Sequence, residues 1–311
     1  LINNALPVVV AKQNGVTLTE EEEAQVQADF KEQIDQMIAQ YASQVDESIT
    51  DEDAKYAEEE KLFKAALKSG GWNYNTYLKM IEDDVRGAAI GNKYMESLYS
   101  GVNVTEDDAK AYYDEQLAAK KAEYAETPAQ FYTDYSNAIS GSDTVGVLTV
   151  PEGYRFCKHI LIKKAEEGDT TKNVNQIVEE VKAKLADGVD FDKLVEEYGE
   201  DPGMKEEPYK TEGYLISENT LDKYYDGFGI AAISLKNIGD VSNPVETEAG
   251  YHFIQYTSDA EVKDTPFEDV KQAIIDKLTE DEKVAIYNDC LEKWKEEIKI
   301  EKYYDRVSGI K

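Results

Sequence analysis

The chain has 311 residues, and its 41% hydrophobic content is enough to bury the cores of two domains. Its 65 acidic residues outnumber its 34 basic residues and give a net charge of -31. Such a charge repels phosphate backbones, so the composition excludes nucleic acid as a partner. No run of 18 apolar residues occurs, and we therefore expect no transmembrane helix. The first residues, LINNALPVVVAKQNG, are neither basic nor long enough for an intact signal peptide, which predicts a trimmed mature protein.

The first 125 residues have the apolar periodicity of amphipathic helices. Thr19 with Glu22 forms a capping-box signature, and apolar residues recur on one helical face from Val26 onward. Similar signatures begin at Thr50 and Thr105. Each helix has one apolar stripe, so we expect these helices to pack on one another.

Between residues 126 and 153 the periodicity fails, and Pro, Gly, Ser and Asp predict a long loop or linker. The run YRFCKHILIKK that follows alternates like a strand and places Cys157, His159 and Leu161 on one face. Helical patterns over 174–185 and 191–198 come next, which predicts a small module of strands and helices.

The C-terminal region returns to helical periodicity. Pro266 marks a helix start, and an apolar stripe runs from Phe267 to Ile298. This stripe needs a partner surface, and the N-terminal helices supply one. The sequence thus predicts that residues 1–150 and 259–311 build one helical domain around an inserted module at 151–258.

The chain has only two histidines, and each lies in a short alternating run. A lone histidine in a strand is usually a buried structural residue. Two in the same kind of segment, with a helix and an Asp-Pro-Gly turn between them, argue against a purely structural role for both. No close pair of metal ligands such as HxxxH or CxxC occurs, and we expect neither a metal nor another cofactor.

The motifs FCKHILIKK, DGVDFDKLVEEYGEDPG, EGYL and AAISLKNIGDVSNPVETEAGYHFIQY follow one another in an order that resembles the parvulin family of peptidyl-prolyl isomerases. The flanking runs VVVAKQNGVTLTEEE and VTEDDAKAYYDEQ resemble extracytoplasmic foldases of the PrsA and SurA type. The resemblance implies an α+β fold. In this fold a discontinuous, all-helical chaperone domain surrounds a parvulin-like domain, whose small mixed or antiparallel sheet is flanked by helices.

The resemblance also assigns residues. It implies a catalytic group made of His159, Asp201, His252, Thr247 and Cys157. The walls of a proline pocket would be Phe228 and Leu215, together with Tyr224 or Leu221. The chain departs from the family at YKTEGYL, where many members have Gly-Gly-Asp-Leu-Gly, and it has Tyr or Leu in place of the usual Met of the pocket. We therefore expect an altered proline pocket.

The implied activity is cis-trans isomerisation of X-Pro bonds, combined with chaperone action on secreted proteins. The alternative is a holdase whose parvulin domain only binds peptide. Partners would be unfolded or newly secreted polypeptides, and the resemblance also allows a homodimer. The implied location is extracytoplasmic, on the outer face of a Gram-positive membrane, with a lipid anchor on a cysteine before residue 1.

Overall fold

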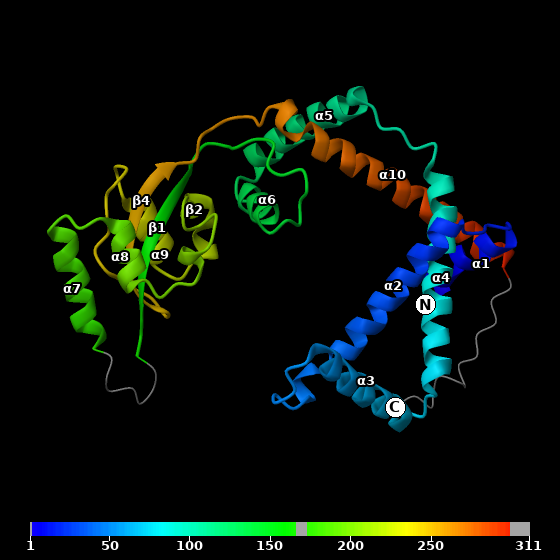
Figure 1. Cartoon of the computed structure of the whole chain (residues 1–311). Coiled ribbons are helices and arrows are strands. Elements are labelled where there is room, and N and C mark those ends of the chain that lie inside the picture. Colours follow the sequence, from blue (N-terminus) through cyan, green and yellow to red (C-terminus); the bar gives the residue numbers. More distant parts are fainter. Residues whose placement is uncertain (1, 166–172, 299–311) are drawn as a thin grey trace. The chain divides into compact units, whose positions relative to one another are not determined.

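The computed structural model describes residues 2–165 and 173–298, and these form two compact units (Figure 1). The first unit comprises residues 2–103 and 279–298, and the second comprises residues 104–278. Within the described residues, no helix combines the length and the apolar character needed to cross a membrane.

The first unit contains four helices of the N-terminal region: α1 (Ile2–Gln13), α2 (Glu20–Ala39), α3 (Glu52–Ser69) and α4 (Tyr74–Tyr99), with a 3-10 turn at Ala42–Gln44. The predicted capping box is confirmed, because the Thr19 side chain accepts from the backbone N–H of Glu22 and the Glu22 carboxylate accepts from that of Thr19. The helix start predicted at Thr50 is wrong by one residue, since Asp51 caps α3. Helix α1 was not predicted, because Pro7 interrupts its pattern.

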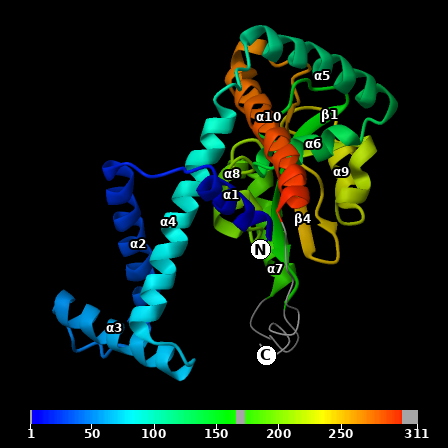
Figure 2. The same cartoon turned by 90° about the vertical axis from the view of Figure 1, so that its right-hand side faces the viewer.

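Helices α2, α3 and α4 share one core, and Figure 2 shows α2 beside α4 with α3 at their end. This core consists of Ile34, Ile38, Phe63, Leu67 and Ile81. Helix α1 packs on α4 through small residues: a Cβ on Gly91 would lie 3.2 Å from Cγ2 of Val8. The glycines of α4 therefore permit a close helix approach that larger side chains would prevent.

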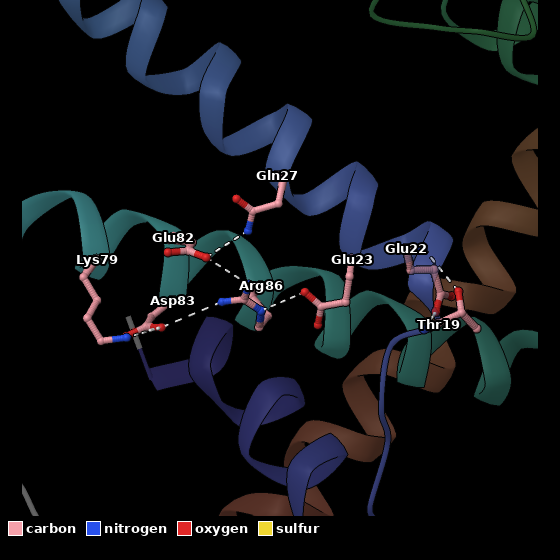
Figure 3. Close-up of polar contacts among 8 residues, drawn as sticks. All are labelled: Thr19, Glu22, Glu23, Gln27, Lys79, Glu82, Asp83 and Arg86. Carbon is pink, nitrogen blue, oxygen red and sulfur yellow. Dashed lines mark hydrogen bonds and ion pairs between the residues drawn. The ribbon is translucent and has the colours of Figure 1, made fainter.

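A polar network also ties α2 to α4 (Figure 3). The Arg86 guanidinium donates from Nε to Glu23 of α2 at 3.1 Å and from Nη2 to Glu82 of α4 at 3.0 Å. Gln27 donates to the same Glu82 carboxylate at 2.8 Å. These groups are partly exposed, so the network contributes at most about 1 kcal/mol per pair and mainly fixes the alignment of the two helices.

Helix α10 (Phe267–Glu297) belongs to both units, because the boundary between them falls after residue 278. Its first part contributes Val270 and Ile274 to a cluster with Tyr113 of α5 (Glu106–Glu126) in the second unit. Its last turns contribute to the core of the first unit. That core combines residues from α1, α4 and α10: Leu6, Val10, Met95, Leu291 and Trp294.

The loop predicted over residues 126–153 is partly wrong, since α6 (Gln130–Ile139) lies within it. The helix forms because its aromatic side chains have a surface to pack on. Phe131 is buried, and its ring lies 4.7 Å from that of Tyr154 on the sheet. The polar composition around α6 concealed this tertiary packing.

The second unit is built on a four-stranded antiparallel sheet in the order β2-β1-β4-β3. The strands are β1 (Tyr154–Lys163), β2 (Tyr214–Ser217), β3 (Val245–Glu246) and β4 (Gly250–Asp259). Helices α7 (Val174–Ala186) and α8 (Phe191–Tyr198) pack on one face with the core around Ile160 and Phe253. Helix α9 (Phe228–Ser234) covers the other face with Cys157 and Ile254. Short 3-10 segments lie at Gly203–Lys205 and Glu218–Lys223. The predicted α+β class is confirmed, with an antiparallel sheet.

Candidate active site

The two histidines lie on adjacent central strands and face the same side of the sheet. In the register of β1 and β4, His252 is opposite Leu161, two residues along from His159. The two Nδ1 atoms are 3.0 Å apart, and the ring planes are inclined by only 17°. His159 is 5% exposed and His252 is 1% exposed. The predicted meeting of the two imidazoles is confirmed.

Asp201 follows α8 and reaches His159 from the side opposite to His252. Its Oδ2 lies 2.7 Å from His159 Nε2 and accepts from the Tyr214 hydroxyl at 2.9 Å. Oδ1 accepts from the backbone N–H of Gly203 at 3.1 Å. Burial alone would raise the pKa of Asp201, but His159, Tyr214 and Gly203 together outweigh it and lower the pKa to about 2. Asp201 is therefore ionised at neutral pH.

Thr247 contacts His252 on the side away from His159, so Asp201, His159, His252 and Thr247 form a hydrogen-bonded row. Its Oγ1 is 2.8 Å from His252 Nε2, 3.3 Å from the carbonyl oxygen of Gly250, and accepts from the Ala249 N–H at 3.2 Å. Burial, and after it the neighbouring His159, lower the pKa of His252 to about 4 against an opposing effect of Asp201. His252 is thus neutral at pH 7.

These contacts allow two proton arrangements. Because ionised Asp201 can only accept, Nε2 of His159 carries a proton in both. If Thr247 donates to Gly250, then Nε2 of His252 is protonated, its Nδ1 accepts, and His159 is an imidazolium. If Thr247 donates to Nε2 of His252, then Nδ1 of His252 donates to Nδ1 of His159 and both rings are neutral. The two arrangements differ by one proton, and the same positions of the heavy atoms fit both.

A cavity of about 640 Å³ opens above this row. Its lining comes from the strands, from the loops around β2 and from α6: Tyr132, His159, Leu161, Lys163, Asp201, Pro202, Tyr214, Asp222, Lys223, Tyr224, Tyr225, Phe228, Ala249 and His252. Aromatic rings dominate the walls. An apolar cavity with a few convergent polar groups is typical of a ligand site.

The rings follow one another from the floor of the cavity to its rim. The Phe228 ring stands edge-on to both imidazoles, with centroids 5.2 Å from each. Tyr224 stacks on Phe228 at 5.6 Å, and Tyr132 meets Tyr224 edge-on at 6.1 Å. Phe228 is only 3% exposed, whereas Tyr224 and Tyr132 are half-buried. Phe228 therefore shapes the floor, and the tyrosines provide most of the accessible aromatic surface.

Two of the residues expected in the proline pocket lie elsewhere. Leu215 is opposite Phe156 in the strand register and packs with Phe131 and Tyr154, away from the cavity. Leu221 lies against α9, where a Cβ on Gly229 would be 2.9 Å from its Cδ2. Neither lines the cavity. The other two residues expected in the proline pocket, Phe228 and Tyr224, line the cavity.

Cys157 lies beside the row, on the face that bears His159, but it does not line the cavity. It is fully buried, and burial raises the pKa of its thiol to about 12. The thiol is therefore protonated at neutral pH and unsuited to nucleophilic attack. Cys157 has the surroundings of a core residue.

The sequence reasoning missed Tyr214 and Tyr132. The motif EGYL could have indicated Tyr214. Tyr214 pairs with Cys157 in the strand register and shares its face, and because side chains alternate along a strand, Leu215 lies on the other face. The alignment to the family motif took the wrong member of this pair. Tyr132 had no such signal, since its helix was not predicted.

The low pKa of His252 predicts an acid-sensitive fold. In the unfolded chain this ring titrates near 6.5. As pH falls from 6.5 towards 4, His252 binds a proton in the unfolded state but not in the folded state. The free energy of unfolding should then drop by up to about 1.4 kcal/mol per pH unit. The His252 ring resonances should not titrate between pH 7.5 and 5 in an NMR experiment. A midpoint above 6 for these resonances would contradict the assignment.

The sequence matches known proteins over this region and beyond it. A family model for the PPIC-type PPIase domain, also called rotamase, matches residues 159–258. The foldase protein PrsA of Clostridium botulinum strain Hall is 28% identical over 261 residues, which cover 84% of this chain and 64% of that protein. That of Clostridium tetani is 26% identical over 273 residues, covering 88% and 75%. The chain thus spans less than two thirds of the length of the first of these relatives.

Solved structures similar to this chain include PrsA from Bacillus anthracis, at 20% identity and a TM-score of 0.27, with 97% of each chain covered. A SurA-like chaperone of Campylobacter jejuni is 22% identical with a TM-score of 0.36, and 87% of this chain and 94% of that chain are covered. The family match spans both histidines, Asp201 and Thr247. The chain therefore carries a PPIC-type PPIase domain, a parvulin, and is a homologue of the PrsA foldases.

Proposed function

We propose that the chain catalyses cis-trans isomerisation of X-Pro peptide bonds in unfolded or newly secreted polypeptides. The observation that carries the proposal is the row of Asp201, His159, His252 and Thr247 at the floor of an aromatic cavity. The row lies within the segment that matches the PPIC-type domain.

The chemistry of this reaction fits such a cavity. Rotation about an X-Pro amide faces a barrier of about 18–20 kcal/mol, and no covalent bond has to break. A site can lower this barrier by binding the twisted amide more tightly than the planar one. In our proposal the proline ring sits against Tyr224 and the edge of Phe228, where it is removed from water. The turned carbonyl then meets the histidine row, whose charge Asp201 holds in place.

We also propose a division of labour along the chain. Residues 151–258 would isomerise the bond, while residues 1–150 and 259–311 would form a chaperone domain that holds unfolded substrate. The similarity to PrsA foldase proteins supports this role. We further propose an extracytoplasmic location with a lipid anchor on the outer face of a Gram-positive membrane, and a homodimer as the working form. Homology to clostridial PrsA foldases supports this placement.

Asp201→Asn tests the catalytic proposal in a protease-coupled isomerisation assay with X-Pro peptides. The variant removes the charge that holds the His159 proton, and a hydrogen bond to a charged group contributes about 1.5–3 kcal/mol. We expect kcat/KM to fall about tenfold to a hundredfold.

Asp192→Asn is the matched control. Asp192 is a carboxylate in the first turn of α8 and pairs with Lys158 of β1 at 2.9 Å, but it does not line the cavity. Its kcat/KM should equal that of the wild-type chain. If the wild-type chain does not accelerate isomerisation of any peptide while it still suppresses aggregation of an unfolded protein, the chain is a holdase with an inert parvulin domain.

A further inference from the structure

The cavity above the histidine row is completed from outside the PPIC-matched segment. Tyr132 lines it, and this residue belongs to α6, which ends 20 residues before the match begins at His159. The other lining residues all lie within residues 159–258. The helix therefore supplies a wall that the PPIase domain alone does not contain.

The position of α6 on the sheet is well defined by contacts on both sides of Tyr132. Phe131 is buried with Tyr154 and Leu215. The Tyr154 hydroxyl donates to the carbonyl oxygen of Pro128 at 2.6 Å, just before the helix. One turn later, the Tyr135 hydroxyl donates to Glu212 at 3.0 Å. Tyr132 is thus positioned in the cavity wall by the packing and hydrogen bonds of its neighbours in α6.

The order of the aromatic rings in the cavity indicates which part of a substrate Tyr132 would contact. Phe228 touches the histidines, Tyr224 stacks on Phe228, and Tyr132 follows Tyr224 at the rim. The Cα atoms of the residues next to a bound proline lie about 3.8 Å from its own Cα across a trans bond and about 2.9 Å across a cis bond. A side chain next to the proline can therefore be in reach of Tyr132, which is linked to Phe228 by two ring contacts.

We propose that Tyr132 is a substrate-binding residue that selects X-Pro peptides with a large apolar side chain adjacent to the proline. The ring is half-buried, so one side of it is available to a ligand. An apolar side chain packed against it loses contact with water and gains ring contacts, whereas alanine reaches neither. This inference rests on the proposed function, because it assumes that the cavity binds proline.

The test uses the full chain and peptides in which Phe, Leu or Ala precedes the proline, together with a second series in which the same residues follow it. Both kcat/KM and the dissociation constant of each peptide are measured. We expect the wild-type chain to prefer Phe and Leu over Ala by about twofold to tenfold in one of the series. Tyr132→Ala should remove that preference, because it weakens the Phe and Leu peptides more than the Ala peptide, whereas Tyr132→Phe should retain it.

Tyr135→Phe is the control on the same helix, because it loses the contact with Glu212 and does not touch the cavity. Its preference should match the wild type. If Tyr132→Ala unfolds, Tyr132→Ser in its place, checked for a native far-UV spectrum, gives the same readout. Unchanged preference in a folded Tyr132 variant overturns the inference, while normal turnover in that case leaves the proposed function intact. Binding without turnover by the wild type refutes the proposed function, and the dissociation constants still decide the role of Tyr132.

Discussion

Replacing Trp294 by alanine is expected to destabilise the helical unit by about 3–5 kcal/mol, the usual cost of removing a large buried aromatic side chain. Trp294 is 6% exposed and lies in the core formed by α1, α4 and α10, with its ring 6.0 Å from that of Tyr94. Alanine would leave a cavity where the last turns of α10 meet the first helix of the chain. Urea unfolding followed by far-UV circular dichroism measures the loss.

The chain has two tryptophans, and the other one is a matched control. Trp72 is 47% exposed and makes an edge-on contact with Tyr77 at 5.7 Å. Trp72→Ala should cost no more than about 1 kcal/mol, because nearly half of that residue is already exposed to water. Equal losses for the two variants would mean that Trp294 is not part of a closed core.

Phe228→Ala is expected to lower both the stability of the second unit and its isomerase activity. Phe228 is the first residue of α9 and packs with Cys157, Ile216 and Ile254, so alanine leaves a cavity that costs about 3–5 kcal/mol. The same substitution removes the ring that stands against both imidazoles. Chemical unfolding and kcat/KM of the folded fraction are the two measurements.

Phe253 separates the two effects. It is as deeply buried, on β4, but belongs to the core on the opposite face of the sheet, beneath α7 and α8. Phe253→Ala should destabilise the unit by a similar amount and leave the activity of the folded fraction unchanged. Phe228→Leu, which keeps most of the volume, should remain folded and bind substrate more weakly. Unaltered kinetics in Phe228→Leu would make Phe228 a purely structural residue.

The sequence alone was enough to predict the elements whose causes are local. The capping box at Thr19 and the alternation in YRFCKHILIKK each depend on residues that are near in the chain, and both are confirmed. The likeness to parvulins supplied the long-range step, namely that Asp201 and the two histidines meet.

What could not be predicted depends on packing between distant segments. Helix α6 is stabilised by the packing of Phe131 against Tyr154, and no local sequence pattern indicates that contact. The error at Leu215 was a slip of one residue in the motif of β2, and in a strand such a slip exchanges the two faces. The roles of the predicted site residues in catalysis stay predictions until the variants are assayed.

The core of the first unit has a consequence for how the protein is made. Leu6 and Val10 are synthesised before the second unit, and their partners Leu291 and Trp294 are synthesised after it. A chain that emerges with its N-terminus first must therefore carry the apolar faces of α1 and α4 uncovered while the whole second unit is produced. Contacts between such distant segments form late, because a long loop has to close before they stabilise anything. A protein proposed to assist the folding of others thus has a helical core that is completed only after its PPIase domain has been synthesised.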